Sequence, residues 1–188
     1  MVRSRLILLI TLTLLSFTAC KKEAAPQRSV HSWNMTSLVD ETGAAVALKS
    51  IERPKVVFFG YSHCPDMCPA ALSQLAKAVK ILGRDGNRIT PVFISLDPSR
   101  DTPETLSAYR DQFDERKLRA FTGDRDQIDR LAKDFGVMYK QSENAAVGYG
   151  IDHTGFYYLL NDGDGLLLAL PVGLSAVELA EQLRETLL

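Results

Sequence analysis

The sequence is poor in the residues that mark several common classes of protein. Three cysteines in 188 residues are too few for a disulfide-stapled scaffold, and a hydrophobic content of 46% lets one domain fold around its own core. There is no run of basic residues, and a formal net charge of −1 gives no sign of a nucleic-acid partner. No internal repeat is visible. We therefore expect one globular domain that does not bind nucleic acid.

The longest apolar run, residues 6–17, is shorter than the roughly 18 residues of a membrane-spanning helix. It follows two arginines and precedes a small residue, which is the layout of a signal peptide, with a short uncleaved anchor as the alternative. The tetrapeptide Phe-Thr-Ala-Cys that ends at Cys20 resembles the cleavage site of bacterial lipoproteins. We expect residues 1–19 to be removed, Cys20 to carry a lipid, and residues 20–29 to tether an exported protein to a bacterial membrane.

One stretch carries both remaining cysteines. Residues 56–59 are a continuous apolar, β-rich run, as expected for a strand buried on both faces. Cys64 and Cys68 follow in a turn, and Pro69 suits the first position of a helix, which predicts Cys68 as the N-cap. Open α/β sheets bind ligands beyond the carboxyl ends of their strands, and a helix N-terminus favours thiolate over thiol. This turn is the candidate active site.

Apolar periodicity and capping residues predict the remaining elements. They are a β-hairpin within residues 30–53, strands at 90–96, 156–160 and 166–170, and helices that follow Thr102, contain residues 128–135 and follow Ser175. Residues 140–152 are polar and contain glycine, so we expect a mobile loop there.

The resulting order is a hairpin followed by β-α-β-α-α-β-β-α. It predicts an α/β protein in which residues 30–188 form a thioredoxin-like three-layer sandwich with an N-terminal β-hairpin extension. In this plan, the strand at 156–160 runs antiparallel to the one at 56–59, so its start lies beside the cysteines. His153 lies just before that start, either as a ligand or as a polar residue that opens a strand.

Three motifs resemble the signatures of the Sco/SenC family. They are Gly-Tyr-Ser-His-Cys-Pro-Asp-Met-Cys-Pro at 60–69, Asp-Pro-Ser-Arg-Asp-Thr-Pro at 97–103 and Asp-His-Thr at 152–154. The similarity covers roughly residues 33–188. Members of this family are membrane-tethered, thioredoxin-like copper proteins used in assembling the dinuclear copper site of cytochrome c oxidase. The resemblance implies that Cys64, Cys68 and His153 are the copper ligands.

The chemistry of these side chains agrees with copper. Two thiolates and one imidazole form a soft, low-coordinate donor set that suits Cu(I) and can also hold Cu(II). A structural zinc site needs a fourth ligand, for which there is no clear candidate. We expect His63 to point away, His31 to lie in the hairpin, and Met67 to pack rather than to bind metal. Asp152 is a candidate acceptor that orients the imidazole.

The spacing of the cysteines favours metal binding over general disulfide exchange. Residues one helical turn apart have Cβ atoms about 5–6 Å apart, whereas a disulfide needs about 3.8 Å. We expect a copper-delivering protein rather than an enzyme. Its partners would be the copper-receiving subunit of the oxidase and a copper donor or thiol reductant. The alternative is a thiol–disulfide oxidoreductase that reduces the cysteines of the copper acceptor, in which Cys64 attacks and Cys68 resolves.

Overall fold

The computed structural model describes residues 28–52, 54–113, 118–144 and 148–188. The predicted signal peptide and the predicted lipidation site, Cys20, lie outside the described residues, as does most of the predicted tether. The last two residues of that tether, Arg28–Ser29, form strand β1 and pair with β10 (Gly165–Pro171), so they belong to the sheet. No helix in the described ranges has the length and apolar character needed to cross a membrane.

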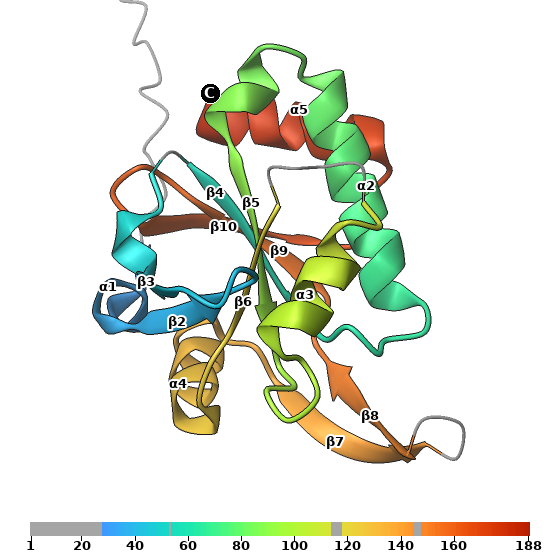
Figure 1. Cartoon of the computed structure of the whole chain (residues 1–188). Helices are drawn as coiled ribbons and strands as arrows, with labels where there is room; N and C mark the ends of the chain where they lie inside the picture. The colour runs from blue at the N-terminus through green and yellow to red at the C-terminus, as the bar shows by residue number, and fades with distance from the viewer. Residues whose placement is uncertain (1–27, 53, 114–117, 145–147) are drawn as a thin grey trace, which may run out of the picture.

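An eight-stranded sheet forms the middle layer, in the order β1-β10-β9-β4-β5-β6-β2-β3 (Figure 1). Its other strands are β2 (Ser37–Asp40), β3 (Ala45–Ala47), β4 (Lys55–Gly60), β5 (Thr90–Ser95), β6 (Arg119–Thr122) and β9 (Phe156–Leu160). Strands β4, β5 and β6 are parallel, and β9 is antiparallel to β4. Every residue of β4 is buried, as predicted for a strand covered on both faces.

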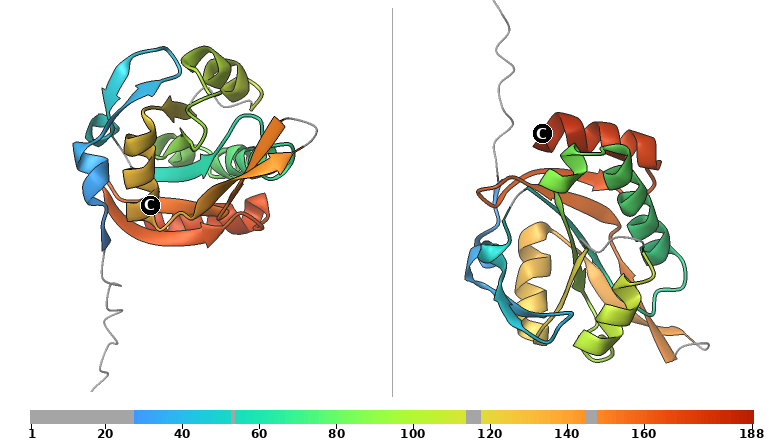
Figure 2. Two further views of the ribbon diagram at one scale, coloured as in Figure 1. Left: turned by 90° about the horizontal axis from the view of Figure 1, so that it is seen from below. Right: turned by 45° about the horizontal axis from the view of Figure 1, so that its top comes forward.

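Helices form the two outer layers. They are α1 (His31–Met35), α2 (Met67–Ile81), α3 (Pro103–Arg110), α4 (Arg125–Phe135) and α5 (Ala176–Leu187). Helices α2, α3 and α5 cover one face of the sheet, and α1 and α4 cover the other (Figures 1 and 2). This arrangement confirms the predicted thioredoxin-like three-layer sandwich.

The predicted helix ends are confirmed at several positions. The Thr102 hydroxyl accepts a hydrogen bond from the Thr105 N–H, which caps α3. Ser175, the predicted residue before α5, forms a capping box with Glu178. Helix α4 ends at Phe135, and the next residue, Gly136, has a φ of 74°, the left-handed conformation that glycine adopts without strain.

The N-terminal extension is partly as predicted. Strands β2 and β3 form the expected hairpin, and the Asp40 carboxylate accepts hydrogen bonds from Thr42 and from the Ala44 N–H in its turn. The residues before it form helix α1 instead of continuing the hairpin, because Trp33 packs against Phe135 of α4. His31 is therefore an exposed residue of this helix and not of the hairpin.

Strand β6 corrects the prediction of two successive helices between β5 and β9. It separates α3 from α4 and extends the parallel part of the sheet. The strand has only four residues and begins with Arg119, whose side chain forms an ion pair with Asp40 at 2.9 Å. A segment this short is too brief to establish an alternating pattern.

The segment predicted as a mobile loop is a second β-hairpin, which corrects that expectation. It consists of β7 (Tyr139–Asn144) and β8 (Gly148–His153), which pair only with each other (Figures 1 and 2). Exposed polar residues such as Lys140 and Glu143 give β7 no apolar periodicity. These strands are held by hydrogen bonds between their backbones, and such pairing cannot be recognised from a polar sequence.

Candidate metal centre

Cys64 and Cys68 lie where β4 ends and α2 begins. Helix α2 starts at Met67 with Asp66 as its N-cap, so the predicted N-cap, Cys68, is already inside the first turn. Pro69 is tolerated there because the first N–H groups of a helix have no intrahelical partner. The Cys68 N–H donates to Sγ of Cys64 at 3.3 Å, whereas the Asp66 side chain makes no capping hydrogen bond. The sulfur of Cys64 therefore caps the helix.

Gly60 makes room for the second sulfur. A Cβ atom at Gly60 would lie 2.8 Å from Sγ of Cys68 and 3.0 Å from Cε2 of Phe93. Cys68 is fully buried in this space, while Cys64 is half-buried. A molecule that approaches from solvent therefore meets Cys64 first.

The two free thiols titrate as a pair. A hydrogen bond from Cys68 lowers the pKa of Cys64 to about 4, and the Cys68 N–H acts in the same direction. The same shared hydrogen bond, together with burial and the nearby Cys64 charge, raises the pKa of Cys68. At neutral pH the pair holds one thiolate, at Cys64, and one thiol, at Cys68.

His153 completes the cluster. It is the last residue of β8, and its Nε2 lies 3.5 Å from Sγ of Cys68. Its Nδ1 is 3.1 Å from the carbonyl oxygen of Thr154, which can only accept, so Nδ1 carries the proton. Nε2 then presents its lone pair to the sulfur, which is the form of histidine that binds metals. The rings of Phe58 and Tyr61 pack beside the imidazole.

The spacing between Cys68 and His153 is close to that of two ligands of one metal ion. Bond lengths of about 2.3 Å to sulfur and 2.0 Å to nitrogen place two ligands of one metal ion about 3.5–3.8 Å apart. The separation of 3.5 Å between Cys68 and His153 falls in this range. In the described ranges, however, no three His, Cys, Asp or Glu side chains already form a complete metal cluster. Binding therefore requires a small adjustment of the donors and deprotonation of Cys68.

A cavity of about 330 Å³ borders His153 on the side of the β7–β8 hairpin. It is lined by Met138, Tyr139, Lys140, Asp152, His153 and Thr154. The Met138 side chain is exposed at its edge. The histidine can therefore be reached from outside without moving the sheet.

The other candidates lie apart from the donors. The exposed His63 hydrogen-bonds to Ser62 at 2.9 Å and points to Asp101, as expected for a residue that does not face the sulfurs. The Met67 side chain packs against Gly155: a Cβ atom added to Gly155 would lie 2.9 Å from Sδ of Met67. Asp152 is exposed, and the Nδ1 proton goes to the Thr154 carbonyl instead, which corrects the orienting role predicted for Asp152. Adjacent strand residues point to opposite faces.

Sequence reasoning did not identify Asp101 as part of the site. Its fully buried carboxylate accepts hydrogen bonds from the N–H and hydroxyl of Ser62 and from the hydroxyl of Ser95. These bonds fix the start of the cysteine loop to the end of β5. The motif at 97–103 was a visible signal, but its partner lies 39 positions away in the sequence.

The sheet order, the helical layers and the cluster of two cysteines and one histidine define a thioredoxin-like protein with a thiol–imidazole site. The sequence model of the SCO1/SenC family matches residues 25–188, and the chain belongs to this family.

Known relatives agree with this family. The chain is 36% identical to protein SenC of Rhodobacter capsulatus over 152 residues, which are 80% of this chain and 68% of the relative. It is similar to the structure of Bradyrhizobium japonicum ScoI with copper bound, at 33% identity and a TM-score of 0.72, covering 80% of this chain and 96% of that one. It is also similar to the crystal structure of Arabidopsis thaliana ScoI with copper bound, at 29% identity and a TM-score of 0.75. That match covers 79% of this chain and 93% of the other.

Proposed function

We propose that this protein binds one copper ion through Cys64, Cys68 and His153 and transfers it to the copper-receiving subunit of cytochrome c oxidase. The observation that carries the proposal is the 3.5 Å approach of the His153 Nε2 to Sγ of Cys68. The donor set is soft, as Cu(I) prefers, and it also accommodates Cu(II). Relatives at 29% and 33% identity have structures with copper bound, and family membership supports the same cargo here. The oxidase acceptor is what the family resemblance implies.

The burial of the ligands suggests an order for transfer. Cys64 and His153 are half-buried, whereas Cys68 is fully buried. An acceptor would first replace Cys64 or His153, and Cys68 would release the ion last. The cavity that borders His153 lets a group of the acceptor approach the imidazole from solvent.

We further propose that the protein acts outside the cytoplasm, tethered by a lipid on Cys20. The sequence pattern that ends at Cys20 and the odd number of cysteines support this anchor. Labelling with a radioactive fatty acid tests it, and Cys20→Ser is the matched variant. Lipid incorporation in Cys20→Ser equal to that of the parent would reject the anchor.

Copper stoichiometry tests the metal function. The reduced protein, desalted after addition of copper, should retain about one copper per chain. Copper binding needs both thiols reduced, because a Cys64–Cys68 disulfide would remove two of the three ligands. Pretreatment with an oxidant should therefore abolish retention, and reduction should restore it. If the reduced protein retains no copper, the proposal is wrong.

A thiol–disulfide oxidoreductase is the second candidate, favoured by the low pKa and greater exposure of Cys64. The Cys64 thiolate would attack an acceptor disulfide, forming a mixed disulfide and releasing one acceptor thiolate. Cys68 would lose its proton and attack the sulfur of Cys64, releasing the second acceptor thiolate. The acceptor gains two electrons and this protein becomes the Cys64–Cys68 disulfide, which a separate thiol reductant must reduce.

His153→Ala distinguishes the functions, because it removes a copper ligand and spares both thiols. Oxidase assembly that survives this change would favour the redox function.

A further inference from the structure

The β7–β8 hairpin carries His153, yet it has little support of its own. A two-stranded hairpin is at best marginally stable in water, and β7 and β8 pair only with each other. Side chains alternate along a strand, so Tyr149, Ile151 and His153 share one face of β8. Ile151 is buried on that face. Contacts that hold this face against the body of the protein therefore determine where the imidazole lies.

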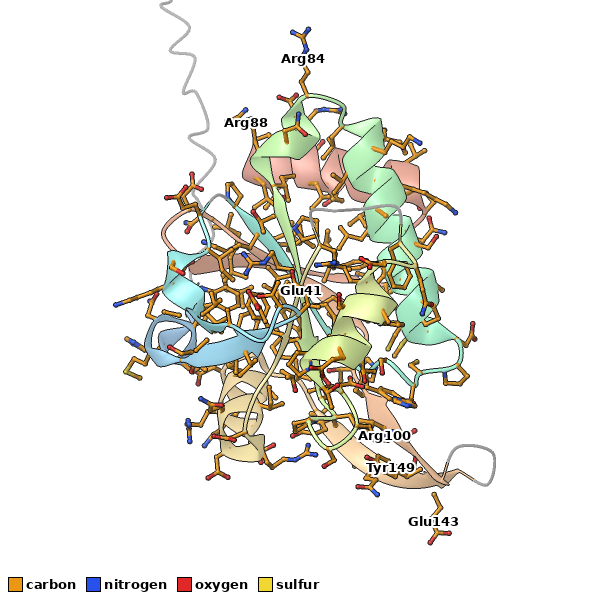
Figure 3. The ribbon with its side chains drawn as sticks, in the orientation of Figure 1. Glu41, Arg84, Arg88, Arg100, Glu143 and Tyr149 are labelled. Atoms are coloured by element: carbon orange, nitrogen blue, oxygen red, sulfur yellow. The ribbon has the colours of Figure 1, made fainter. Side chains whose placement is uncertain are left out.

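Arg100 contacts that face at Tyr149. Its Cζ lies 3.5 Å from the centre of the Tyr149 ring, and its Nη1 donates to the Tyr149 carbonyl oxygen at 3.1 Å. Its Nε donates to the carboxylate of Asp97, and the Tyr149 hydroxyl donates to the other oxygen of that carboxylate at 2.8 Å. Figure 3 shows the Arg100 and Tyr149 side chains side by side next to the hairpin. The contacts form a closed set of three residues.

The surroundings make these contacts strong. Asp97 is fully buried, and the side chain of Arg100 is only 18% exposed. Hydrogen bonds and ion pairs gain strength where water is excluded. A planar guanidinium can stack on an aromatic ring and at the same time donate hydrogen bonds from its edge to acceptors around that ring. A lysine ammonium cannot do both. Tyr149 is therefore held in one position relative to the loop between β5 and α3.

The same loop also holds the cysteines. Asp101, one residue after Arg100, accepts two hydrogen bonds from Ser62, which precedes Cys64 by two positions. The loop thus contacts the cysteine turn on one side and the histidine hairpin on the other.

We propose that Arg100 and Asp97 position His153 for copper by fixing Tyr149, an arrangement we call the Tyr149 clamp. None of the three residues donates to the metal. The clamp holds the strand that ends in His153, so that Nε2 stays opposite Cys68. The copper part of this inference rests on the proposed function.

Two variants test the Tyr149 clamp without leaving a buried charge. Tyr149→Leu removes the ring and the hydroxyl but retains an apolar side chain, and Arg100→Lys keeps a positive charge beside Asp97. Replacing Arg100 by an apolar residue would leave the buried Asp97 carboxylate without its cation, which destabilises proteins strongly. Glu143→Gln is the matched control, because Glu143 is the cross-strand partner of Tyr149 and its exposed side chain points away from the body of the protein (Figure 3).

Copper affinity is measured by competition with a chromophoric Cu(I) chelator, using the reduced full-length protein. We expect Tyr149→Leu to weaken binding about 10-fold, the size of effect usual for residues that orient a metal ligand. Arg100→Lys should also weaken it, and Glu143→Gln should leave it unchanged. Each variant is also made in a His153→Ala background, where loss of the clamp should have no further effect. An equal loss in both backgrounds, or unchanged affinity in Tyr149→Leu, overturns the proposal.

A copper-free measurement separates this inference from the proposed function. The imidazole C–H resonances of His153 are sensitive to the rings of Phe58 and Tyr61, which pack beside it. Tyr149→Leu should shift and broaden these resonances in the copper-free protein, and Glu143→Gln should not. Unchanged His153 resonances in Tyr149→Leu overturn the clamp even if the parent binds no copper. Failure of the parent alone to bind copper rejects the proposed function instead.

Discussion

Nε2 of His153 lies 3.5 Å from Sγ of Cys68, although the two residues are 85 positions apart in the sequence. The approach depends on strand direction. Strand β9 runs antiparallel to β4, so the chain enters β9 at the edge of the sheet where β4 ends and the cysteines begin. The Thr154 carbonyl holds the proton on Nδ1 and leaves Nε2 free. An imidazole nitrogen therefore lies beside what would otherwise be a plain dithiol.

Replacing the two nearby histidines should have very different effects on copper. His153→Ala removes one of the three proposed donors, so its Cu(I) affinity should fall by more than the roughly 10–100-fold usual for residues that only orient a ligand. His63→Ala should bind copper as the parent does, because His63 is exposed and hydrogen-bonds to Ser62. Chelator competition on both reduced variants measures this. Equal affinities of the two variants would show that His153 is not a ligand.

The sequence predicted the position of this site because its parts follow strong local rules. The apolar run of β4 and the proline at the start of α2 placed the cysteines at a strand end, and the antiparallel course of β9 placed His153 beside them. These rules concern burial and chain direction, which periodicity reveals.

Contacts between polar side chains could not be predicted in the same way. The motif at 97–103 was visible, but Asp101 binds Ser62 from 39 positions away, and Arg100 binds Tyr149 from 49 positions away. Strands β7 and β8 expose polar residues such as Lys140 and Glu143, so nothing in their composition distinguishes them from a loop. Only the folded chain places these groups together.

The reactivity of Cys64 should depend little on pH. Its pKa is lowered to about 4 by the hydrogen bonds from the Cys68 side chain and the Cys68 N–H, so it is already a thiolate from pH 6 to pH 9. An ordinary thiol with a pKa of about 8.5 reacts roughly tenfold more slowly for each pH unit below that value. Alkylation by iodoacetamide, followed by mass spectrometry, should therefore show a flat rate for Cys64 across this range.

The unfolded protein provides the control for this measurement. In denaturant the hydrogen bond from Cys68 is lost, so the Cys64 rate should rise with pH as for an ordinary thiol. Cys68 is buried and its pKa is raised, so it should react slowly in the folded protein at every pH in the range. A folded-state Cys64 rate that rises tenfold per pH unit between 6 and 8 would contradict the lowered pKa.

A methyl group at Gly60 should disturb the second sulfur. In Gly60→Ala, the added Cβ would lie 2.8 Å from Sγ of Cys68, closer than real Cβ atoms approach. Overpacking of this kind typically destabilises a protein by about 1–3 kcal/mol, and the displaced sulfur should also weaken copper binding. Gly173→Ala is the control, because nothing lies within 4 Å of a Cβ there. Denaturant unfolding and chelator competition are measured on both variants, and similar results for the two would count against the close approach.

The last prediction concerns stability at the opposite end of β4. The Lys55 ammonium and the Asp164 carboxylate form an ion pair at 2.5 Å, with the lysine side chain 1% and the aspartate side chain 9% exposed. Lys55→Met would leave the Asp164 charge buried without its partner, which costs about 3–5 kcal/mol. Adding Asp164→Asn removes that charge, and asparagine tolerates the left-handed φ of 61° at this position. The double variant should therefore regain most of the lost free energy of unfolding.

Denaturant midpoints with their m-values report this recovery. Copper affinity should not change in either variant, because Lys55 lies about 17 Å along the strand from Gly60. If the double variant is as unstable as Lys55→Met, the loss comes from the lysine side chain itself and not from the unpaired charge.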